Sequence, residues 1–169
     1  MCASSIAEDH VDIRARLLWD KWEPLLKQAN IPVRLTDIPP TKPSGTVSAL
    51  FKEDSNGQRT ILTETILISK NVSAESRAWT LFHELSHFVL GHNRVSNSEI
   101  SEMRKEFECE WITQLLYRRF FPGVKSKYSL DVSYYSKSIY DDEFIRNIVF
   151  HQERVEEAYK KILCILQGD

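Results

Sequence analysis

Two histidines four residues apart, His83 and His87, are the side chains best suited to metal chemistry in this chain, and Glu84 follows the first of them. In an α-helix, residues i and i+4 lie on one face about one turn apart, so two imidazoles at this spacing can hold one cation. Glu84 would lie about 100° further round the helix, beside the cation but not bound to it. A carboxylate placed there can take a proton from a water molecule at the metal. The pattern His-Glu-x-x-His therefore predicts two metal ligands, His83 and His87, and a catalytic base, Glu84.

The competing interpretation is an ordinary amphipathic helix whose histidines are satisfied inside a hydrophobic core. Large apolar residues do surround the motif, namely Leu81, Phe82, Leu85, Phe88 and Val89. Burying two histidines in such surroundings costs free energy unless both find partners. This cost favours the metal interpretation.

A catalytic zinc ion usually has three protein ligands and one open position, so a third ligand is needed. The pattern with a third histidine on an extended motif would require Gly at position 90 and His at position 93. The chain has Leu90 and Asn93 instead, which excludes that arrangement. We expect His92, just past the end of the helix, to point elsewhere.

A glutamate from the following helix is the other source of a third ligand, and the chain offers Glu106, Glu108 and Glu110. Three acids at i, i+2 and i+4 cannot share one helical face. Glu106 and Glu110 can, with the first as the ligand and the second as an outer acid that orients a histidine. Glu108 would then face away. A solvated acidic face is the alternative for all three, and the spacing leaves open which of them is the ligand.

The elements that must position these residues are predicted from hydrophobic periodicity and turn signals. Residues 6–30 are expected to form an N-terminal helix with Ile6, Ile13, Leu17, Leu18 and Trp22 on one side and a kink or restart at Pro24. The proline-rich segment 31–45 is expected to form a short strand followed by a loop. Strand-forming runs follow at 46–54, 59–65 and 66–71, with Asn56-Gly57 as a hairpin signal, and indicate two or three strands of a small, mostly antiparallel sheet.

Helices dominate the rest of the chain. The motif helix is expected to begin after an N-cap at Ser73 and to end at Gly91. Residues 96–121 predict the glutamate-bearing helix, which ends before Pro122-Gly123, and residues 141–167 predict one or two C-terminal helices. The fold class is therefore α+β. At 169 residues the chain corresponds to a single domain, with a catalytic core over 31–121, a loop region over 122–140 and a C-terminal helical part over 141–167.

Composition excludes several classes of protein. Hydrophobic residues make up 42% and charged residues 27%, as in soluble globular proteins, and the net charge of -2 argues against direct nucleic-acid binding. No apolar run reaches the roughly 18 residues of a membrane span. The first residues lack the apolar segment of a signal peptide, and the three cysteines are odd in number and widely spaced. We therefore expect a cytoplasmic protein.

The segments 80–92, "TLFHELSHFVLGH", and 106–116, "EFECEWITQLL", resemble the ImmA/IrrE-type metallopeptidases. In that family the motif helix reads His-Glu-Leu-Gly-His with a trailing Leu-Gly-His, and the next helix carries Glu-x-Glu-Ala-Asn. This chain differs at Ser86, Cys109 and Glu110, where the family has glycine, alanine and asparagine. The resemblance covers roughly 31–116 and leaves both ends of the chain unmatched.

The resemblance implies a small zincin-like metallopeptidase domain. It assigns His83, His87 and Glu106 to one Zn²⁺ ion, with Mn²⁺ or another divalent metal as alternatives, and Glu84 to the catalytic base. It further implies an intracellular endopeptidase whose protein substrate is a helix-turn-helix transcriptional repressor of a phage, mobile element or stress regulon. Two rival functions are a non-proteolytic metal-binding scaffold or sensor, and a metallopeptidase toxin or anti-defence effector. The intact Glu84 speaks against the scaffold, since a scaffold needs no base.

Overall fold

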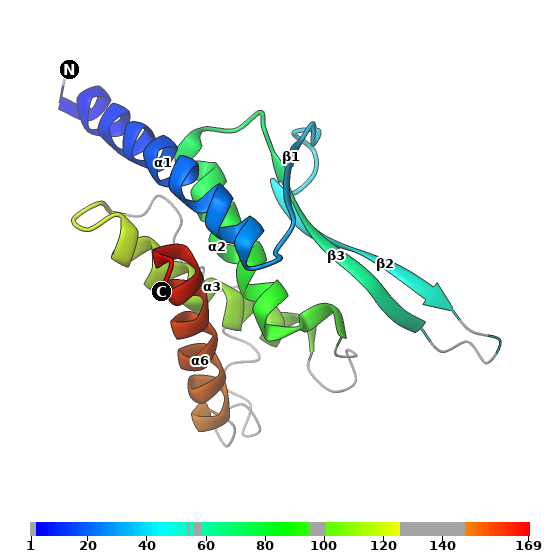
Figure 1. Ribbon diagram of the computed structural model, residues 1–169. Helices are drawn as coiled ribbons and strands as arrows, with labels where there is room; N and C mark the ends of the chain where they lie inside the picture. Colours follow the sequence, from blue (N-terminus) through cyan, green and yellow to red (C-terminus); the bar gives the residue numbers. More distant parts are fainter. Residues whose placement is uncertain (1–2, 54, 56–58, 95–100, 126–147) are drawn as a thin grey trace.

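The computed structural model describes residues 3–53, 55, 59–94, 101–125 and 148–169. Across these residues the chain combines four α-helices with one small three-stranded sheet, which is the expected α+β class (Figure 1). The predicted loop at 122–140 falls almost wholly outside the described residues. None of the helices in the described part is long and apolar enough to cross a membrane.

The sheet is mixed, with the strand order β1–β3–β2. β2 (Gly45–Glu53) and β3 (Arg59–Ser69) are antiparallel, as the hairpin signal predicts, although the turn residues themselves lie outside the described part. Most of the pairing is antiparallel, as predicted, but β1 (Val33–Thr36) runs parallel to β3. The reason is topological: the chain crosses from β1 to the opposite side of β3 before the hairpin begins.

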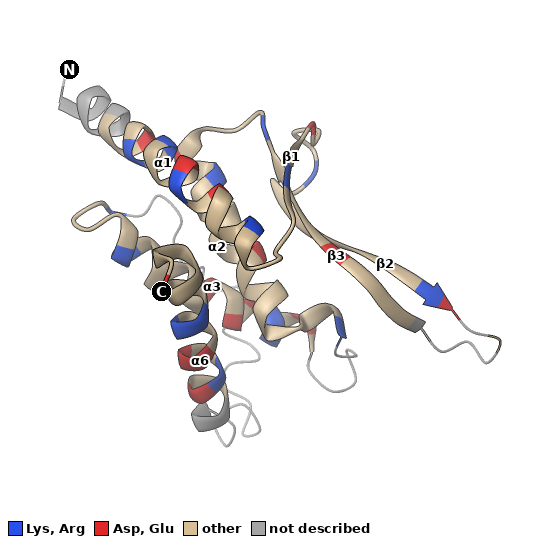
Figure 2. Ribbon diagram, viewed as in Figure 1, with Lys and Arg blue, Asp and Glu red and all other residues tan. Residues whose placement is uncertain are grey.

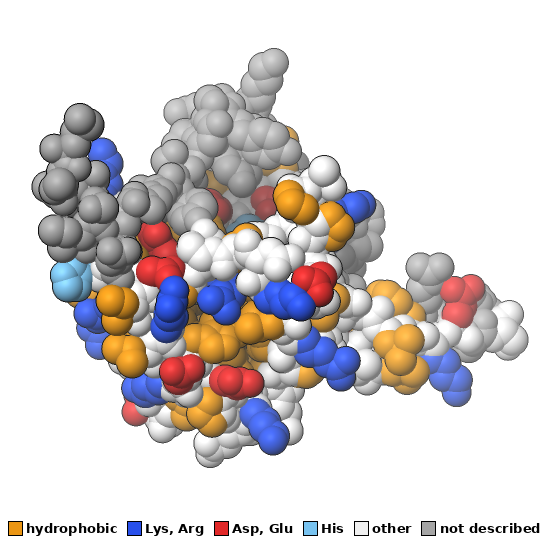
Figure 3. Space-filling model, turned by 90° about the horizontal axis from the view of Figure 1, so that it is seen from above, with side chains coloured by type: hydrophobic (Ala, Val, Ile, Leu, Met, Phe, Trp, Pro, Cys, Tyr) orange, Lys and Arg blue, Asp and Glu red, His pale blue; other side chains and the backbone are white. Residues whose placement is uncertain are grey.

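The β2–β3 hairpin projects from the body of the molecule as an arm (Figure 1). A bulge interrupts the pairing between Leu50 and Phe51, and hydrophobic side chains are exposed along the arm (Figure 3). Leu50 is 59% exposed, Phe51 44% and Leu62 58%. The arm therefore offers apolar surface away from the core.

α1 (Ala3–Gln28) continues through Pro24, so the restart expected there is absent. Its buried side agrees with the predicted one only in part: Trp22 is buried as expected, but Ile13 and Leu17 are exposed, and Ala15 and Leu26 are buried instead. The three buried residues are spaced by seven and four positions and line one face of the helix. The helix carries more apolar residues than one face can bury, and packing against α2 selects the face that contains Trp22.

α2 (Ala74–Leu90) has the ends that its sequence predicts. The Ser73 hydroxyl accepts a hydrogen bond from the Ser76 backbone N–H at 3.1 Å, and Gly91 takes the left-handed conformation with φ of 69°. A single 3-10 turn, η1 (His92–Arg94), follows at once. The motif helix therefore has defined ends, and the chain turns sharply behind it.

α3 (Glu102–Phe120) ends just before Pro122, as predicted, and α6 (Ile148–Gln167) forms the described C-terminal helix. Val155 and Ile162 of α6 are buried. α6 packs on both α2 and α3 (Figure 1). Acidic and basic residues are interspersed along α1 and α6 (Figure 2).

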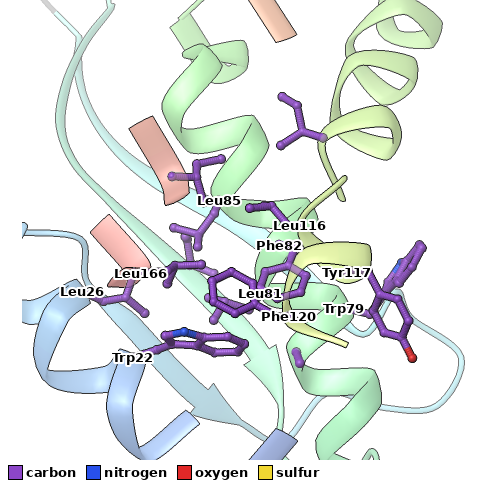
Figure 4. Close-up of a cluster of buried hydrophobic side chains, with 14 of the residues drawn as sticks. Trp22, Leu26, Trp79, Leu81, Phe82, Leu85, Leu116, Tyr117, Phe120 and Leu166 are labelled. Atoms are coloured by element: carbon purple, nitrogen blue, oxygen red, sulfur yellow. The ribbon is translucent and has the colours of Figure 1, made fainter. Parts of the chain in front are cut away.

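An aromatic cluster joins α1, α2 and α3 behind the histidine motif (Figure 4). The ring of Trp22 meets the rings of Phe82 and Phe120 edge-on, with centroids 5.2 and 5.1 Å away. Trp22 and Phe82 have no exposed surface. His83 follows Phe82 and lies about 100° further round the helix, so this packing fixes the rotation of α2 and directs the histidines away from the aromatic cluster.

Candidate metal site

The two motif histidines converge as their spacing predicts. His83 Nε2 and His87 Nε2 lie 3.1 Å apart on one face of α2. Both side chains are mostly buried, at 22% and 13% exposure. The helix thus presents two imidazole nitrogens at a single point.

α3 supplies a carboxylate at the same point. Glu106 Oε2 lies 3.2 Å from His83 Nε2, and Glu106 Oε1 lies 3.2 Å from His87 Nε2. Glu110, one turn later, has its Oε2 3.8 Å from His83 Nδ1. Glu106 and Glu110 therefore share the face of α3 that turns to the motif, and Glu110 lies on the outer side of His83.

The donor set and its spacing fit a divalent metal. Two histidines and a glutamate are a known ligand set of catalytic zinc sites that keep one position open. A tetrahedral ion with bonds of about 2.0–2.1 Å separates its ligand atoms by roughly 3.3–3.4 Å. Here the two Nε2 atoms lie 3.1 Å apart, and each lies 3.2 Å from one oxygen of the Glu106 carboxylate, Oε2 for His83 and Oε1 for His87. His83, His87 and Glu106 could thus hold one ion with little movement.

Mutual contacts control the ionisation of these groups. Burial disfavours charge on Glu106, but hydrogen bonds from His83 and His87 outweigh it and hold the pKa of this carboxyl well below its usual value. Burial likewise disfavours the charged form of His83, yet the hydrogen bond and charge of Glu106 raise the pKa of this imidazole. Glu106 is therefore a carboxylate at neutral pH, which is the form that binds a cation.

Glu84 lies under the start of β2. A Cβ atom added to Gly45 would come within 3.1 Å of Glu84 Oε1 and 2.3 Å of Thr80 Cγ2, so only glycine permits this close approach. The Val47 backbone N–H donates to the Glu84 carboxylate. Burial raises the pKa of Glu84, which interacts electrostatically with His83 and His87. A partly desolvated carboxylate with a raised pKa is suited to accept a proton and release it again.

His92 departs from its predicted position, and Glu108 has buried partners that the sequence did not indicate. His92 is buried rather than turned away, and its Nδ1 lies 3.0 Å from His87 Nδ1. Glu108 does face away from Glu106, but it meets no solvent: it is fully buried and its Oε2 lies 3.0 Å from His92 Nε2. The sharp turn after Gly91 folds His92 back behind His87. A buried imidazole-carboxylate pair thus adjoins the candidate ligands.

Cys109 lies in this second group. Its Sγ is 3.4 Å from His92 Nδ1, and burial raises the pKa of its thiol well above the usual value. His87, His92 and Cys109 together form a second group of atoms that could hold a cation. The trailing Leu-Gly-His of the motif segment was the one sequence signal that could have pointed to His92.

The sequence offers four candidate donors for a developing oxyanion, namely His92, Tyr128, Tyr134 and Tyr135. Tyr128, Tyr134 and Tyr135 lie outside the described residues. His92, the fourth candidate, directs its two ring nitrogens to His87 and Glu108.

Comparison with known proteins identifies the class. The chain matches the family model of the IrrE N-terminal-like domain over residues 27–115, which is more than half of its length. The chain therefore belongs to this family of metallopeptidases, and family membership implies a divalent metal. No curated protein and no solved structure matched the chain. The match confirms the resemblance seen in the motif segments, and α6 lies beyond the matched range.

Proposed function

We propose that this chain is a zinc-dependent endopeptidase of the His-Glu-x-x-His plus Glu type. His83, His87 and Glu106 hold one ion, and Glu84 is the general base. The observation that carries the proposal is that the Nε2 atoms of His83 and His87 lie 3.1 Å apart and each lies 3.2 Å from an oxygen of Glu106, with Glu84 beside them.

A cation held by His83, His87 and Glu106 would polarise the carbonyl of the scissile peptide bond and make the attacking water more acidic. Glu84 accepts the proton of the attacking water and then delivers it to the leaving amine nitrogen. The Val47 N–H and the tight fit of Gly45 hold this carboxylate in place. Glu110, 3.8 Å from His83 Nδ1, favours one orientation of that imidazole.

The surroundings of the site suit an extended polypeptide substrate. β2 is an edge strand of the described sheet, and its first residues lie against Glu84. A peptide that paired along such an edge would gain main-chain hydrogen bonds. Further along the arm, the exposed Leu50 and Phe51 would contact apolar side chains of a folded partner. We propose a cytoplasmic helix-turn-helix transcriptional repressor of a phage, mobile element or stress regulon as that partner, as the family resemblance implies.

Elemental analysis of the purified protein tests the metal site. We expect about one zinc per chain in the wild type and loss of the metal in His83→Ala. Wild-type protein that binds no metal, even after zinc or manganese is added, would contradict the proposal.

Cleavage is tested with Glu84→Gln as the matched control, because glutamine keeps the shape of the side chain but cannot act as the base. Each protein is co-expressed with repressors encoded nearby, and new chain ends are identified by mass spectrometry. We expect cleavage by the wild type only, with the variant slower by about 10²–10⁴-fold at unchanged zinc content. Equal cleavage by both would remove Glu84 from its role, and zinc binding without cleavage would favour a scaffold.

A further inference from the structure

His87 is contacted at both ring nitrogens, and the two contacts have different partners. Nε2 faces His83 and Glu106, where the metal would lie, whereas Nδ1 faces His92 Nδ1 at 3.0 Å. A metal-binding histidine needs a bare nitrogen on the metal side and usually donates its other N–H to an acceptor. The group that accepts a hydrogen bond from His87 Nδ1–H therefore influences whether His87 Nε2 is free to bind the metal.

Glu108 determines which nitrogen of His92 carries hydrogen. Its carboxylate can only accept, so the contact at 3.0 Å places a hydrogen on His92 Nε2. Neutral His92 then has a bare Nδ1, which accepts from His87 Nδ1–H. His87 is left with a bare Nε2 directed to Glu106 and His83. The sequence of contacts thus selects the tautomer of His87 that can bind a cation.

Glu108 is itself held by α6. His151 Nδ1 lies 2.6 Å from Glu108 Oε1, while Arg154 donates from Nε at 3.1 Å and from Nη2 at 3.2 Å. This bidentate contact with Arg154 fixes the plane of the Glu108 carboxylate. Glu108 has no exposed surface, and His92 is 1% exposed, so water does not compete for these contacts.

We propose that His92 is a positioning residue for the metal site and that Glu108, clamped by α6, holds it in the required tautomer. This inference rests on the proposed function, because it presumes a cation at His83, His87 and Glu106. α6, a helix outside the matched family region, is thereby coupled to the metal site through Glu108, His92 and His87. His83 differs, since its outer contact is the single carboxylate of Glu110.

Three substitutions at His92 separate positioning from simple packing. In His92→Asn, the side-chain oxygen can occupy the place of Nδ1 and accept from His87. In His92→Gln, the amide nitrogen can reach Glu108, but no acceptor remains beside His87. In His92→Phe, both contacts are lost while the volume is kept.

Zinc affinity is measured by competition with a chromophoric chelator, the cobalt-substituted protein is followed by its visible absorption, and thermal unfolding is recorded without metal. We expect zinc affinity to fall about 10–100-fold in His92→Phe and His92→Gln, and to stay near the wild-type value in His92→Asn. The order of unfolding temperatures among the metal-free variants should differ from the order of their zinc affinities. His92→Gln should unfold at a higher temperature than His92→Phe. Wild-type affinity in all three, or affinity losses that simply follow the unfolding temperature, would overturn the positioning role.

The coupling to α6 is tested with Arg154→Met, with Gln152→Ala as the matched control on the exposed side of the same helix. We expect reduced zinc affinity in Arg154→Met and no change in the control. Unchanged affinity in both would separate α6 from the metal site.

Three further outcomes distinguish failure of the proposed function from failure of this inference. Wild-type protein without any zinc would overturn the proposed function together with this inference, whereas one zinc insensitive to every His92 variant would overturn the inference alone. Two zinc ions per chain, one of them lost in Cys109→Ala, would also overturn it and assign His87, His92 and Cys109 to a second ion.

Discussion

Glu106 and Glu108 stand one residue apart on α3 and contact different histidines. Glu106 lies 3.2 Å from both His83 and His87, whereas Glu108 lies 3.0 Å from His92. Residues i and i+2 of a helix lie about 200° apart around its axis. One side of α3 therefore contacts the candidate metal site, and the other side contacts the buried network.

Substitution of the two glutamates should therefore have different effects on zinc binding and on stability. Glu106→Gln should lose zinc while the metal-free protein keeps its stability, because the lost charge is partly exposed. Glu108→Gln should lower the free energy of unfolding by about 2–4 kcal/mol, since Arg154 would lose a buried charged partner. Zinc content and urea unfolding of the metal-free proteins measure the two effects. Equal stability losses in both variants would contradict this division.

Removing the metal should destabilise the wild type. An ion that binds only the folded state stabilises it by about 4 kcal/mol when its free concentration is 1,000 times the dissociation constant. We expect the unfolding temperature to rise when zinc is added to the chelator-treated protein, and no rise in His83→Ala. Calorimetry with and without zinc measures the shift, and an equal rise in the variant would place the ion elsewhere.

Gly45 should tolerate no side chain. An added methyl group would lie 2.3 Å from Thr80 Cγ2, so Gly45→Ala should destabilise the fold by about 1–3 kcal/mol and displace Glu84. Thr80→Ser removes that methyl group and keeps the hydroxyl that lies 2.8 Å from Ser44 Oγ. Gly45→Ala combined with Thr80→Ser should recover part of the stability in urea unfolding. A Gly45→Ala protein as stable as the wild type would contradict the close approach of β2 and α2.

Asp12 of α1 joins the start of α2. Its Oδ1 accepts from the Glu75 backbone N–H at 3.1 Å, and Arg16 lies beside it at 2.9 Å. Asp12→Ala should therefore cost about 1 kcal/mol, as for the loss of a helix N-cap. Asp12→Asn should cost less, because asparagine keeps an acceptor.

The contribution of Asp12 should depend on pH. Burial opposes ionisation of this carboxyl, but the Glu75 backbone and Arg16 outweigh it and lower its pKa in the folded protein. The charged form is thus favoured by folding, so its contribution is complete above the unfolded pKa of about 3.9 and is lost as the pH falls through the folded value. The stability difference between wild type and Asp12→Asn should shrink from pH 6 toward pH 3. A stability difference that grows as the pH falls would contradict the lowered pKa of Asp12 in the folded protein.

Local sequence rules work where neighbours along the chain decide the structure. Ser73 and Gly91 bound α2 because capping depends on a few adjacent backbone groups. The same rules mislead at α1, where Leu17 and Ile13 fit an apolar pattern and yet remain exposed. Periodicity reports that a helix has an apolar side, but the partner helix selects which residues that side contains.

The sequence by itself determined that His83 and His87 share a helical face with Glu84 beside them, since a period of 3.6 residues leaves no other arrangement in a helix. It also placed Glu106 and Glu110 together on the next helix. Only the tertiary structure decided that this face of α3 turns to the histidines, that His92 folds back onto His87, and that α6 holds Glu108. Those contacts join residues up to 46 positions apart, and they depend on how α2, α3 and α6 pack, which no short stretch of sequence encodes.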